Sequence, residues 1–222
     1  MSDELLWPAV LLTGQLALST TLLLLIISVP LAWWLVKTRS IFRPWIEAVI
    51  ALPLALPPTV LGFYLLVLLG HQGFIGQWMT SIGLEPWVFR FPGLLVGSLL
   101  YSLPFAVHPL QTAFRLFDMR LLESAKTLGA GPWRCFVDVV LPQTRNGFLT
   151  AAVLSFAHTV GEFGVVLMVG GNIPGQTQVL STLIYDRVEA MDYQSANQIA
   201  IGLLLFSITI LWWIYARLGH RD

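Results

Sequence analysis

Five long apolar stretches, separated by short polar segments, dominate the pattern of hydrophobic and polar positions along the chain. A helix needs about 20 mostly apolar residues to cross a bilayer, and inside the bilayer only a helix or a closed barrel satisfies its own backbone hydrogen bonds. We therefore predict an all-α membrane protein, a polytopic bundle of about five transmembrane helices in a single domain over residues 1–222. The predicted spans lie near residues 10–36, 46–69, 93–114, 148–169 and 199–218.

Composition supports a membrane location. The chain is 56% hydrophobic and 11% charged, whereas a soluble domain carries about 25% charged residues. The formal net charge is zero, so the total charge indicates no particular partner, and we expect no nucleic acid. The first ten residues, MSDELLWPAV, are acidic where a signal peptide is basic, so the first apolar stretch is expected to remain in the mature protein. The single cysteine, Cys135, cannot form an internal disulfide.

The basic residues predict how the spans are oriented. Positively charged loops stay on the cytoplasmic side of a membrane protein. Only Arg90 and Arg187 fall on one predicted side of this chain. We therefore predict a multi-pass protein of a bacterial or archaeal inner membrane, with its N-terminus outside and its C-terminus in the cytoplasm. The other ten basic residues, all on the predicted cytoplasmic side, are Lys37, Arg39, Arg43, Arg115, Arg120, Lys126, Arg134, Arg145, Arg217 and Arg221.

The polar segment between the third and fourth spans, residues 115–147, is predicted to form two short helices. One covers residues 119–128 and ends at Gly129, which can take the left-handed conformation of a helix C-terminus. Another begins at Pro132 and is stopped by Leu141 and Pro142. Two short helices joined in this way are suited either to docking in a groove on another protein or to lying on the membrane surface. The residue spacing alone does not distinguish these two arrangements. The apolar face expected on the first helix consists of Leu121, Leu122, Ala125 and Leu128.

The fourth span contains two ionisable residues, His158 and Glu162, together with the polar Ser155 and Thr159. Ser155, His158, Thr159 and Glu162 recur at helical spacing and are predicted to share one face. Ionisable groups inside a membrane usually face a bundle interior or a wet cavity, so this stripe is a candidate lining for a translocation path. The alternative is structural, because His158 and Glu162 are one turn apart and could pair with each other.

Other features of the membrane segments concern the path itself. Pro57 and Pro58 in the second span each remove a backbone donor, which predicts a break at a cavity or simply a kinked helix. No predicted span has Lys or Arg in its interior, so a strong fixed site for an anion is not expected there. The outer segment 170–196, which contains Asn172, is predicted to be either a lid or docking surface for an outside partner or a plain solvated loop. The sequence has no G-x-x-x-x-G-K-[ST] motif, so the chain is not expected to hydrolyse ATP.

The polar segment also carries a family resemblance. It reads Glu123-Ser-Ala, three residues, Gly129, nine residues, and Val139-Val-Leu-Pro142, which resembles the EAA loop of ABC-importer permeases. Ser124 and Val139 depart from that pattern, at the first Ala and the Ile. The resemblance implies a cytoplasmic coupling helix that docks on a separate ATPase. It therefore favours docking on a partner protein over an arrangement in which the two short helices lie on the membrane surface. The coupling residues that it implies are Glu123, Ser124, Ala125, Leu128, Gly129, Leu141 and Pro142.

Further motifs are similar to those of molybdate-type permeases, a branch close to sulfate permeases. The short five-span layout and the proline-rich second span favour molybdate, the last two motifs are shared with sulfate relatives, and His158 is a departure. The matching segments are residues 52–70 (LPLALPPTVLGFYLLVLLG), 73–76, 125–131, 161–164 (GEFG) and 171–175 (GNIPG) with Thr177.

This resemblance implies a type I ABC-importer permease, a transport subunit and no enzyme. Its partners would be a second permease copy in a homodimer, two cytoplasmic ATPase subunits that carry ATP and magnesium, a periplasmic or surface oxyanion-binding protein, and the lipid bilayer. No cofactor is expected on this chain. Ser155, Thr159 and Asn172 would offer neutral hydrogen bonds to a passing oxyanion, whereas the Glu162 carboxylate would repel it. ATP-driven closure of the ATPases would move the coupling loop and open the path outward.

Three alternatives remain at this point. A secondary transporter would use an intramembrane carboxylate, for which Glu162 is the candidate, and would need no coupling loop. A membrane-embedded assembly subunit would have no path at all. Among ABC importers, molybdate, tungstate and sulfate are not distinguished by this chain.

Overall fold

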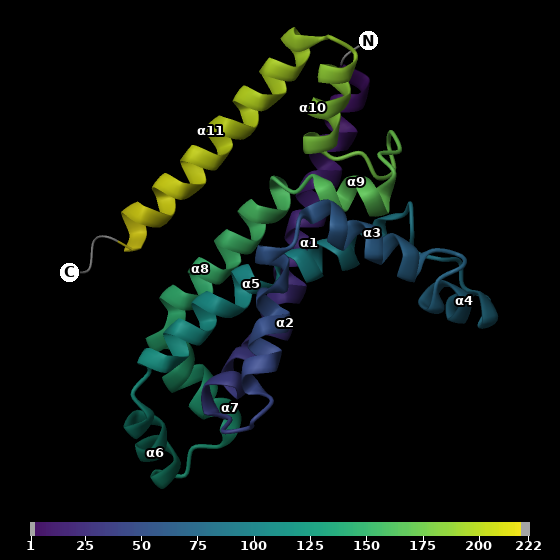
Figure 1. Cartoon of the computed structure of the whole chain (residues 1–222). Helices are drawn as coiled ribbons and strands as arrows, with labels where there is room; N and C mark the ends of the chain where they lie inside the picture. The colour runs from purple at the N-terminus through teal and green to yellow at the C-terminus, as the bar shows by residue number, and fades with distance from the viewer. Residues whose placement is uncertain (1–2, 219–222) are drawn as a thin grey trace.

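The computed structural model describes residues 3–218, and every regular element among them is a helix. The prediction of an all-α membrane protein is confirmed: four of the described helices are long and apolar enough to cross a membrane, or five if the bent pair α8–α9 is one span. Arg221 and the two chain termini, whose sides were predicted above, lie outside the described residues. The helices (Figure 1) are α1 Asp3–Lys37, α2 Arg43–Ala55, α3 Pro58–Leu69, α4 Phe74–Ser81, α5 Phe91–Leu116, α6 Met119–Thr127, α7 Pro132–Arg134, the π-helix η1 Cys135–Val140, α8 Leu141–Val160, α9 Gly164–Gly170, α10 Leu180–Glu189 and α11 Tyr193–Leu218.

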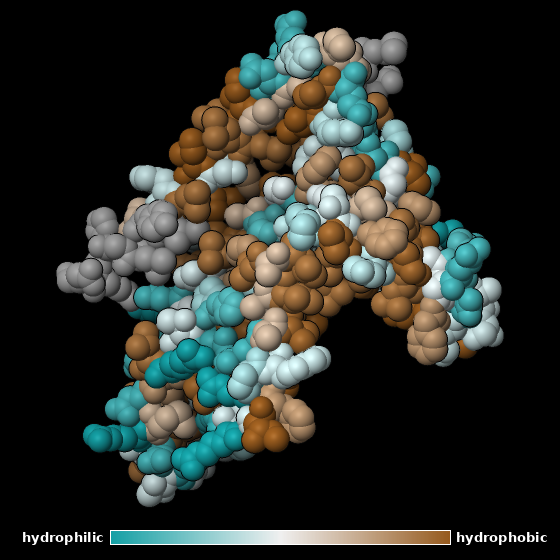
Figure 2. Space-filling model, viewed as in Figure 1, coloured by the Kyte–Doolittle hydropathy of each residue, from teal (hydrophilic) through white to brown (hydrophobic). Residues whose placement is uncertain are grey.

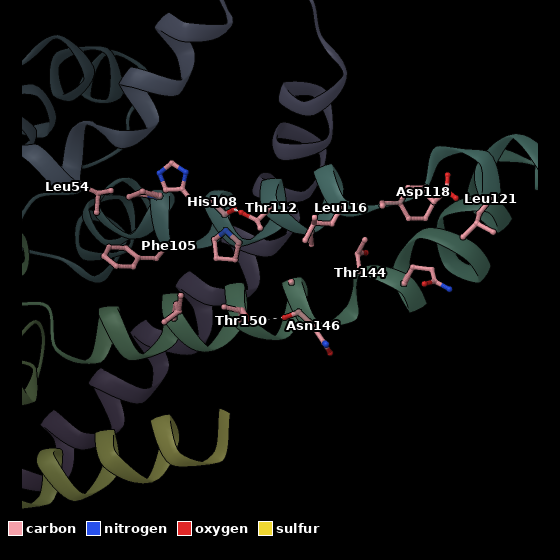
Figure 3. A pocket seen from close by; sticks show the side chains of 17 residues that line it. Leu54, Phe105, His108, Thr112, Leu116, Asp118, Leu121, Thr144, Asn146 and Thr150 are labelled. Atoms are coloured by element: carbon pink, nitrogen blue, oxygen red, sulfur yellow. Dashed lines mark hydrogen bonds between the residues drawn. The ribbon is translucent and has the colours of Figure 1, made fainter. Parts of the chain in front are cut away.

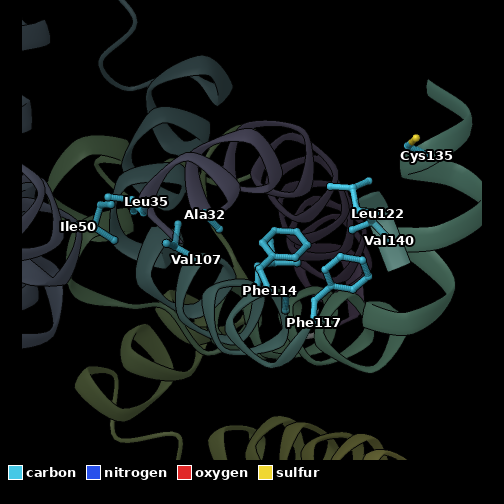
Figure 4. Close-up of a cluster of buried hydrophobic side chains, with 11 residues drawn as sticks. Ala32, Leu35, Ile50, Val107, Phe114, Phe117, Leu122, Cys135 and Val140 are labelled. Atoms are coloured by element: carbon cyan, nitrogen blue, oxygen red, sulfur yellow. The ribbon is translucent and has the colours of Figure 1, made fainter. Parts of the chain in front are cut away.

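The long helices α1, α5 and α8 pack against one another and form the centre of the molecule. The largest buried apolar cluster lies at the end of these helices nearest α6 and α7 (Figure 4). Trp33 of α1 meets Phe114 of α5 edge to face, with 5.1 Å between ring centroids. Leu122 of α6 and Val140 of η1 belong to the same cluster. The polar loop is therefore held rigidly against the ends of the membrane helices.

The predicted second span, residues 46–69, is divided into α2 and α3. Leu56 is extended, with φ −86° and ψ 141°, because a residue before proline avoids the helical region. Pro57 and Pro58 then remove two consecutive backbone donors, and α3 starts afresh at Pro58. Figure 1 shows α2 running alongside the central helices, while α3 turns across them and leads to α4. The two prolines therefore redirect the chain instead of bending one helix.

The predicted fourth span, residues 148–169, is also broken. Helix α8 ends at Val160, and α9 begins at Gly164 after a bend of 60°. Glu162 lies in the break. The expectation that it shares one helical face with Ser155, His158 and Thr159 is therefore wrong, because the helical period ends before Glu162 is reached.

The predicted stop at Leu141 and Pro142 is wrong. The backbone stays helical from α7 through η1 into α8, with φ −60° and ψ −45° at Leu141. Proline in an ordinary helix collides with the carbonyl four residues earlier. The wider π-turn of η1 directly precedes Pro142, and such bulges relieve this conflict and often occur at functional sites. The loop is thus joined to α8 by a continuous helix.

The polar segments lie at two opposite ends of the molecule. Figure 1 shows α6 and α7 at one end and α10 at the other. In Figure 2, hydrophilic side chains gather over the α6–α7 end, and hydrophobic side chains cover much of α11 and α3. Arg120, Lys126 and Arg134 belong to the α6–α7 end, whereas Arg187 lies on α10. This separation is the arrangement that the charge pattern predicts, although which end faces the cytoplasm stays a prediction.

Candidate functional site

A groove of about 760 Å³ runs between α5 and α8 toward the α6 end of the molecule. Figure 3 shows side chains from both helices pointing into it. The lining positions recur every three or four residues, so each helix contributes one face. The principal lining residues are Phe105, His108, Thr112 and Leu116 of α5, and Asn146, Thr150 and Leu154 of α8.

The exposed lining of this groove is mixed, because Leu54, Leu116 and Leu121 are exposed beside polar side chains. His108, Thr112 and Asn146 are exposed, although they lie on helices of membrane-spanning length. The hydroxyls of Thr112 and Thr150 donate to the carbonyls four residues before them, at 3.0 and 2.8 Å, which satisfies their protons. Polar side chains in a membrane face water or another protein. The α5–α8 face is therefore the part of the described bundle best suited to line a wet path or a partner subunit.

Three aromatic rings separate this groove from a second cavity. The His158 ring stacks on Phe105, with 3.9 Å between centroids, and lies 4.7 Å from the ring of Tyr101. Its Nδ1 atom is hydrogen bonded to the Ser102 hydroxyl of α5 at 2.9 Å. This bond fixes the ring orientation. His158 lines the second cavity, of about 420 Å³, and Phe105 lines the first. The ring cluster therefore forms a constriction between the two spaces.

Glu162 lies in the second cavity and is only 3% exposed. Both of its carboxyl oxygens lack a hydrogen-bond partner among the described residues. The Ser98 hydroxyl lies near this carboxyl but makes no hydrogen bond of good geometry with it. His158 bonds Ser102 instead, so the pairing of His158 with Glu162 is not observed. A buried carboxyl without partners is costly, and such a group in a cavity is a candidate functional residue.

The two helix breaks face each other at this cavity. A Cβ atom added to Gly164 would lie 2.8 Å from the Cβ atom of Pro58 and 3.3 Å from the backbone nitrogen of Thr59. A Cβ atom added to Gly62 of α3 would lie 2.8 Å from the Cβ atom of Met168 in α9. Pro58 also lines the Glu162 cavity, and Pro57 precedes α3 as its N-cap. The helices that follow the two breaks, α3 and α9, are therefore packed closely against each other.

The other predicted path residues lie elsewhere. Ser155 and Thr159 of α8 are buried, and the Thr159 hydroxyl lies 3.1 Å from that of Ser102 on α5. Asn172 belongs to the turn before α10 and donates its amide to Asp186 at 2.6 Å. The structure therefore brings His158 and Glu162 together at one cavity and does not bring Ser155, Thr159 or Asn172 to it.

Sequence reasoning misses this groove. It places Asn146 in the polar loop and gives Thr112 and Thr150 no role. Their signal is a spacing of four along α8, from Asn146 through Thr150 and Leu154 to His158. The matching face of α5 can be identified only once the two helices are seen to pack against each other.

The coupling segment is anchored on one side and exposed on the other. The Asp118 carboxylate caps α6 by accepting a hydrogen bond from the backbone N–H of Arg120 at 2.9 Å. Gly129 ends the helix with φ +83°, as predicted. Of the expected apolar face, Leu122 and Ala125 pack against the core. Leu121 and Leu128 do not, because the rest of the described chain does not cover that side; Leu128 is 88% exposed.

The exposed side of this segment combines charge with large apolar groups. Glu123 and Ser124 are exposed, and Trp133, at the start of the second helix, is 75% exposed. Exposed apolar groups at a polar end of a membrane protein mark a protein contact. Leu141 and Pro142 do not belong to this surface, because they begin α8.

Comparisons with known proteins agree on one family. The sequence pattern of the family described as "Binding-protein-dependent transport system inner membrane component" matches residues 25–221. The chain is 56% identical over 208 residues to the "Molybdenum transport system permease protein ModB" of Azotobacter vinelandii, which is 94% of this chain and 92% of that protein. It is 33% identical over 219 residues to ModB of Escherichia coli K12, covering 97% and 95%. It is 34% identical over 194 residues to the "Sulfate transport system permease protein CysT" of Escherichia coli K12, covering 86% and 70%.

Solved structures share the fold. A chain of the bacterial alginate ABC transporter, solved with a periplasmic protein that carries an alginate pentasaccharide, superposes with a TM-score of 0.78 at 18% identity, covering 99% of this chain and 81% of that one. A chain of the MetNI methionine ABC transporter, in an inward-facing conformation, gives a TM-score of 0.71 at 18% identity, covering 96% of both chains.

Proposed function

This chain belongs to the family of binding-protein-dependent transport system inner membrane components, and we propose that it is the membrane-spanning subunit of an ATP-driven importer whose solute is molybdate. The observation that carries the proposal is the identity of 56% to a molybdenum transport permease over 94% of the chain. Relatives named for sulfate transport match at lower identity than this and over less of their own length. Sulfate is therefore the second candidate.

The coupling segment supports energy supply from a partner. Its exposed side, formed by Glu123, Leu128 and Trp133, would contact a cytoplasmic ATPase that carries ATP and magnesium. Its buried side, through Leu122 and η1, is fixed to the ends of α1 and α5. Because α7, η1 and α8 are one continuous helix, a displacement of the segment would be passed directly to α8. The chain itself is a transport subunit and not an enzyme.

The groove supports a path formed between two copies. The polar face of His108, Thr112 and Asn146 is exposed in the single chain and would be exposed to lipid unless a second copy covered it. A homodimer would enclose two such faces around a common path. The ring cluster of Tyr101, Phe105 and His158 would then narrow that path near the Glu162 cavity. Motion of α8 relative to α5 would open or close the constriction, as a bistable bundle requires.

The direction of transport follows from the predicted orientation. The α6–α7 end would lie in the cytoplasm, because segments rich in basic residues stay on that side, and the α10 end would lie outside. A periplasmic or surface binding protein would deliver the oxyanion to the outer end. No Lys or Arg side chain lines the described groove, so the solute would be held weakly in transit, and the binding protein would supply most of the selectivity.

The test is uptake into proteoliposomes that contain the chain, its ATPase and its binding protein. We expect molybdate uptake that requires ATP, is competed by tungstate of similar size and charge, and is competed at least tenfold less well by sulfate. Equal competition by sulfate would replace molybdate with a broader oxyanion substrate.

A second arm removes ion gradients with an ionophore while ATP is maintained. Uptake should persist, because the energy comes from ATP. Loss of uptake in this arm would contradict the importer and would favour secondary transport through Glu162.

A further inference from the structure

A mainly apolar slot of about 460 Å³ lies between α1 and α11, apart from the groove. One face of α11 lines it, with Ser195, Gln198, Gly202 and Phe206 at helical spacing, and the opposite wall includes Gly14 of α1. Leu180 and Arg187 of α10 lie at one end of the slot. Toward the other end lie the rings of Phe156 and Phe206, whose centroids are 6.2 Å apart.

The depth of the slot matches one leaflet of a bilayer. Ser195 and Phe206 are eleven residues apart, which at 1.5 Å per residue is about 16 Å. The hydrocarbon core of a bilayer is about 30 Å thick, so one leaflet spans about half of that. A transmembrane helix of a neighbouring subunit must cross the full thickness, whereas the lining of the slot extends along α11 only from Ser195 to Phe206. A single hydrocarbon chain inserted from one leaflet fits.

Two glycines leave space in the slot that no described residue of this chain fills. A Cβ atom added to Gly14 or Gly202 would meet no atom within 4 Å. Glycine inside a helix costs about 1 kcal/mol relative to alanine, and neither glycine recovers this through close packing within the described residues. Gly62 and Gly164, in contrast, are in close contact with their neighbours.

The α10 end of the slot carries opposite charges. Arg187 lines the slot, and its Nη1 atom lies 3.7 Å from the Asp192 carboxylate, longer than a strong charge-assisted hydrogen bond. The guanidinium therefore keeps donors free for a phosphate. Hydrogen bonds from Ser195 hold the pKa of Asp192 below its ordinary value, so its carboxylate is charged. The neighbouring acids are engaged elsewhere: Asp186 with Asn172 and Gln178, and Glu189 with Tyr185.

We propose that this slot binds one zwitterionic glycerophospholipid, with an acyl chain between α1 and α11, its phosphate on Arg187 and its ammonium group near Asp192. The adjacent positive and negative side chains are complementary to a phosphate and an ammonium group, and the apolar slot is complementary to the chain. The bound lipid would fill the space between α1 and α11 and set the position of α11. This site is independent of the transported solute.

Native mass spectrometry of the purified full-length chain tests the proposal. Phosphatidylethanolamine, phosphatidylglycerol and diacylglycerol are added in separate titrations to delipidated protein in detergent. We expect one phosphatidylethanolamine per chain, with at least tenfold higher occupancy than diacylglycerol, which has no headgroup phosphate. Arg187→Gln should remove this difference. Equal occupancy by phosphatidylglycerol would overturn the zwitterionic assignment, and equal occupancy by diacylglycerol would overturn the headgroup site.

The slot itself is tested by filling it. Gly202→Leu should lower phosphatidylethanolamine occupancy at least fivefold, whereas Ala200→Leu adds an equally large side chain to an exposed position of α11 outside the slot and should not. Gly14→Leu fills the opposite wall and repeats the test if Gly202→Leu does not fold. Equal occupancy in the filled and control variants would refute the proposal. Loss of the dimer mass in Gly202→Leu with lipid retained would assign the slot to a second copy and refute it equally.

Discussion

At the scale of single residues, Gly129 and Gly131 of the coupling segment differ in backbone conformation but not in packing. Both have open space where a Cβ atom would be. Gly129 has φ +83°, a conformation that L residues adopt only with strain. Gly131 has φ −69° and ψ 164°, which any residue can adopt. Packing therefore does not distinguish the two positions, and only backbone conformation does.

Gly129→Val is expected to lower ATP-dependent molybdate uptake at least tenfold. A β-branched residue at positive φ is strongly disfavoured, at a cost of about 1–2 kcal/mol or more, so the end of α6 would rearrange. The matched control Gly131→Val should keep uptake near that of the wild type. Uptake measured in proteoliposomes with equal amounts of both variants decides this, and similar uptake in the two would show that the left-handed turn does not matter for coupling.

Glu162 is the residue whose burial is least compensated within the described structure. Its two carboxyl oxygens have no hydrogen-bond partner there, and removal of an unsatisfied buried group can stabilise a protein. Residues that cost stability are often retained for function. Stability and transport should therefore respond in opposite directions when this carboxyl is removed.

Glu162→Met is expected to raise the free energy of unfolding by about 1–3 kcal/mol and to lower uptake at least fivefold. Thermal unfolding in detergent measures the first effect, and uptake in proteoliposomes the second. Glu85→Met, which removes only an exposed ion-pair partner of Arg90, should change stability by less than about 1 kcal/mol. A loss of stability in Glu162→Met would instead make Glu162 a structural anchor.

At the scale of elements, the two broken helices explain how the bundle is assembled. Pro57 and Pro58 redirect the chain into α3, and the break after Val160 redirects it into α9. Helices α3 and α9 then pack together through Gly62 and Gly164. Close helix approach through small residues is a common packing mode in membranes. The close packing of α3 on α9 thus depends on the absence of side chains at Gly62 and Gly164.

Gly62→Ala is expected to destabilise the protein by about 1–3 kcal/mol. The added Cβ atom would lie 2.8 Å from the Cβ atom of Met168 and 3.1 Å from the Cα atom of Val165, so α3 and α9 would have to separate. Gly14→Ala, also inside a helix but facing open space, should stabilise by up to about 1 kcal/mol through helix propensity. Thermal unfolding in detergent measures both, and the same sign for the two would contradict the packing argument.

At the scale of the whole molecule, the polar segments are divided between two ends, with α6 and α7 at one and α10 at the other (Figure 1). An importer uses these ends differently, since an ATPase docks inside the cell and a binding protein outside. The charge pattern predicts that the α6–α7 end faces the cytoplasm. The assignment of each function to an end depends on this orientation.

Cysteine labelling in intact cells tests the orientation. The native Cys135 is 3% exposed and is replaced by alanine. In this background we expect Glu189→Cys, on α10, to react with a membrane-impermeant maleimide added outside, and Ser124→Cys, on α6, to react only after the membrane is permeabilised. Both side chains are exposed in this chain, and the cells express the chain without its ATPase, so that no docked subunit covers Ser124. The reverse pattern would invert the proposed topology.

The sequence by itself determined the local features of this protein. Long apolar stretches require helices in a bilayer, and the asymmetry of Lys and Arg predicts an orientation. The turn at Gly129 and the start of a helix at Pro132 follow from the conformations that these two residues favour. The family resemblance of residues 123–142 is likewise contained in the order of residues. Each of these depends on neighbours a few positions away, so one sequence is sufficient to find them.

Only the tertiary structure decided which side chains meet. Periodicity grouped Glu162 with Ser155 and Thr159, but a helix break and the rotation of α8 against α5 separate them. Helical spacing placed Leu122 and Leu128 on one face, yet only Leu122 is covered by the ends of α1 and α5. The groove pairs a face of α5 with a face of α8, from which α6, α7 and η1 separate it along the chain. Contacts of this kind depend on how helices are rotated and packed, which local spacing does not encode.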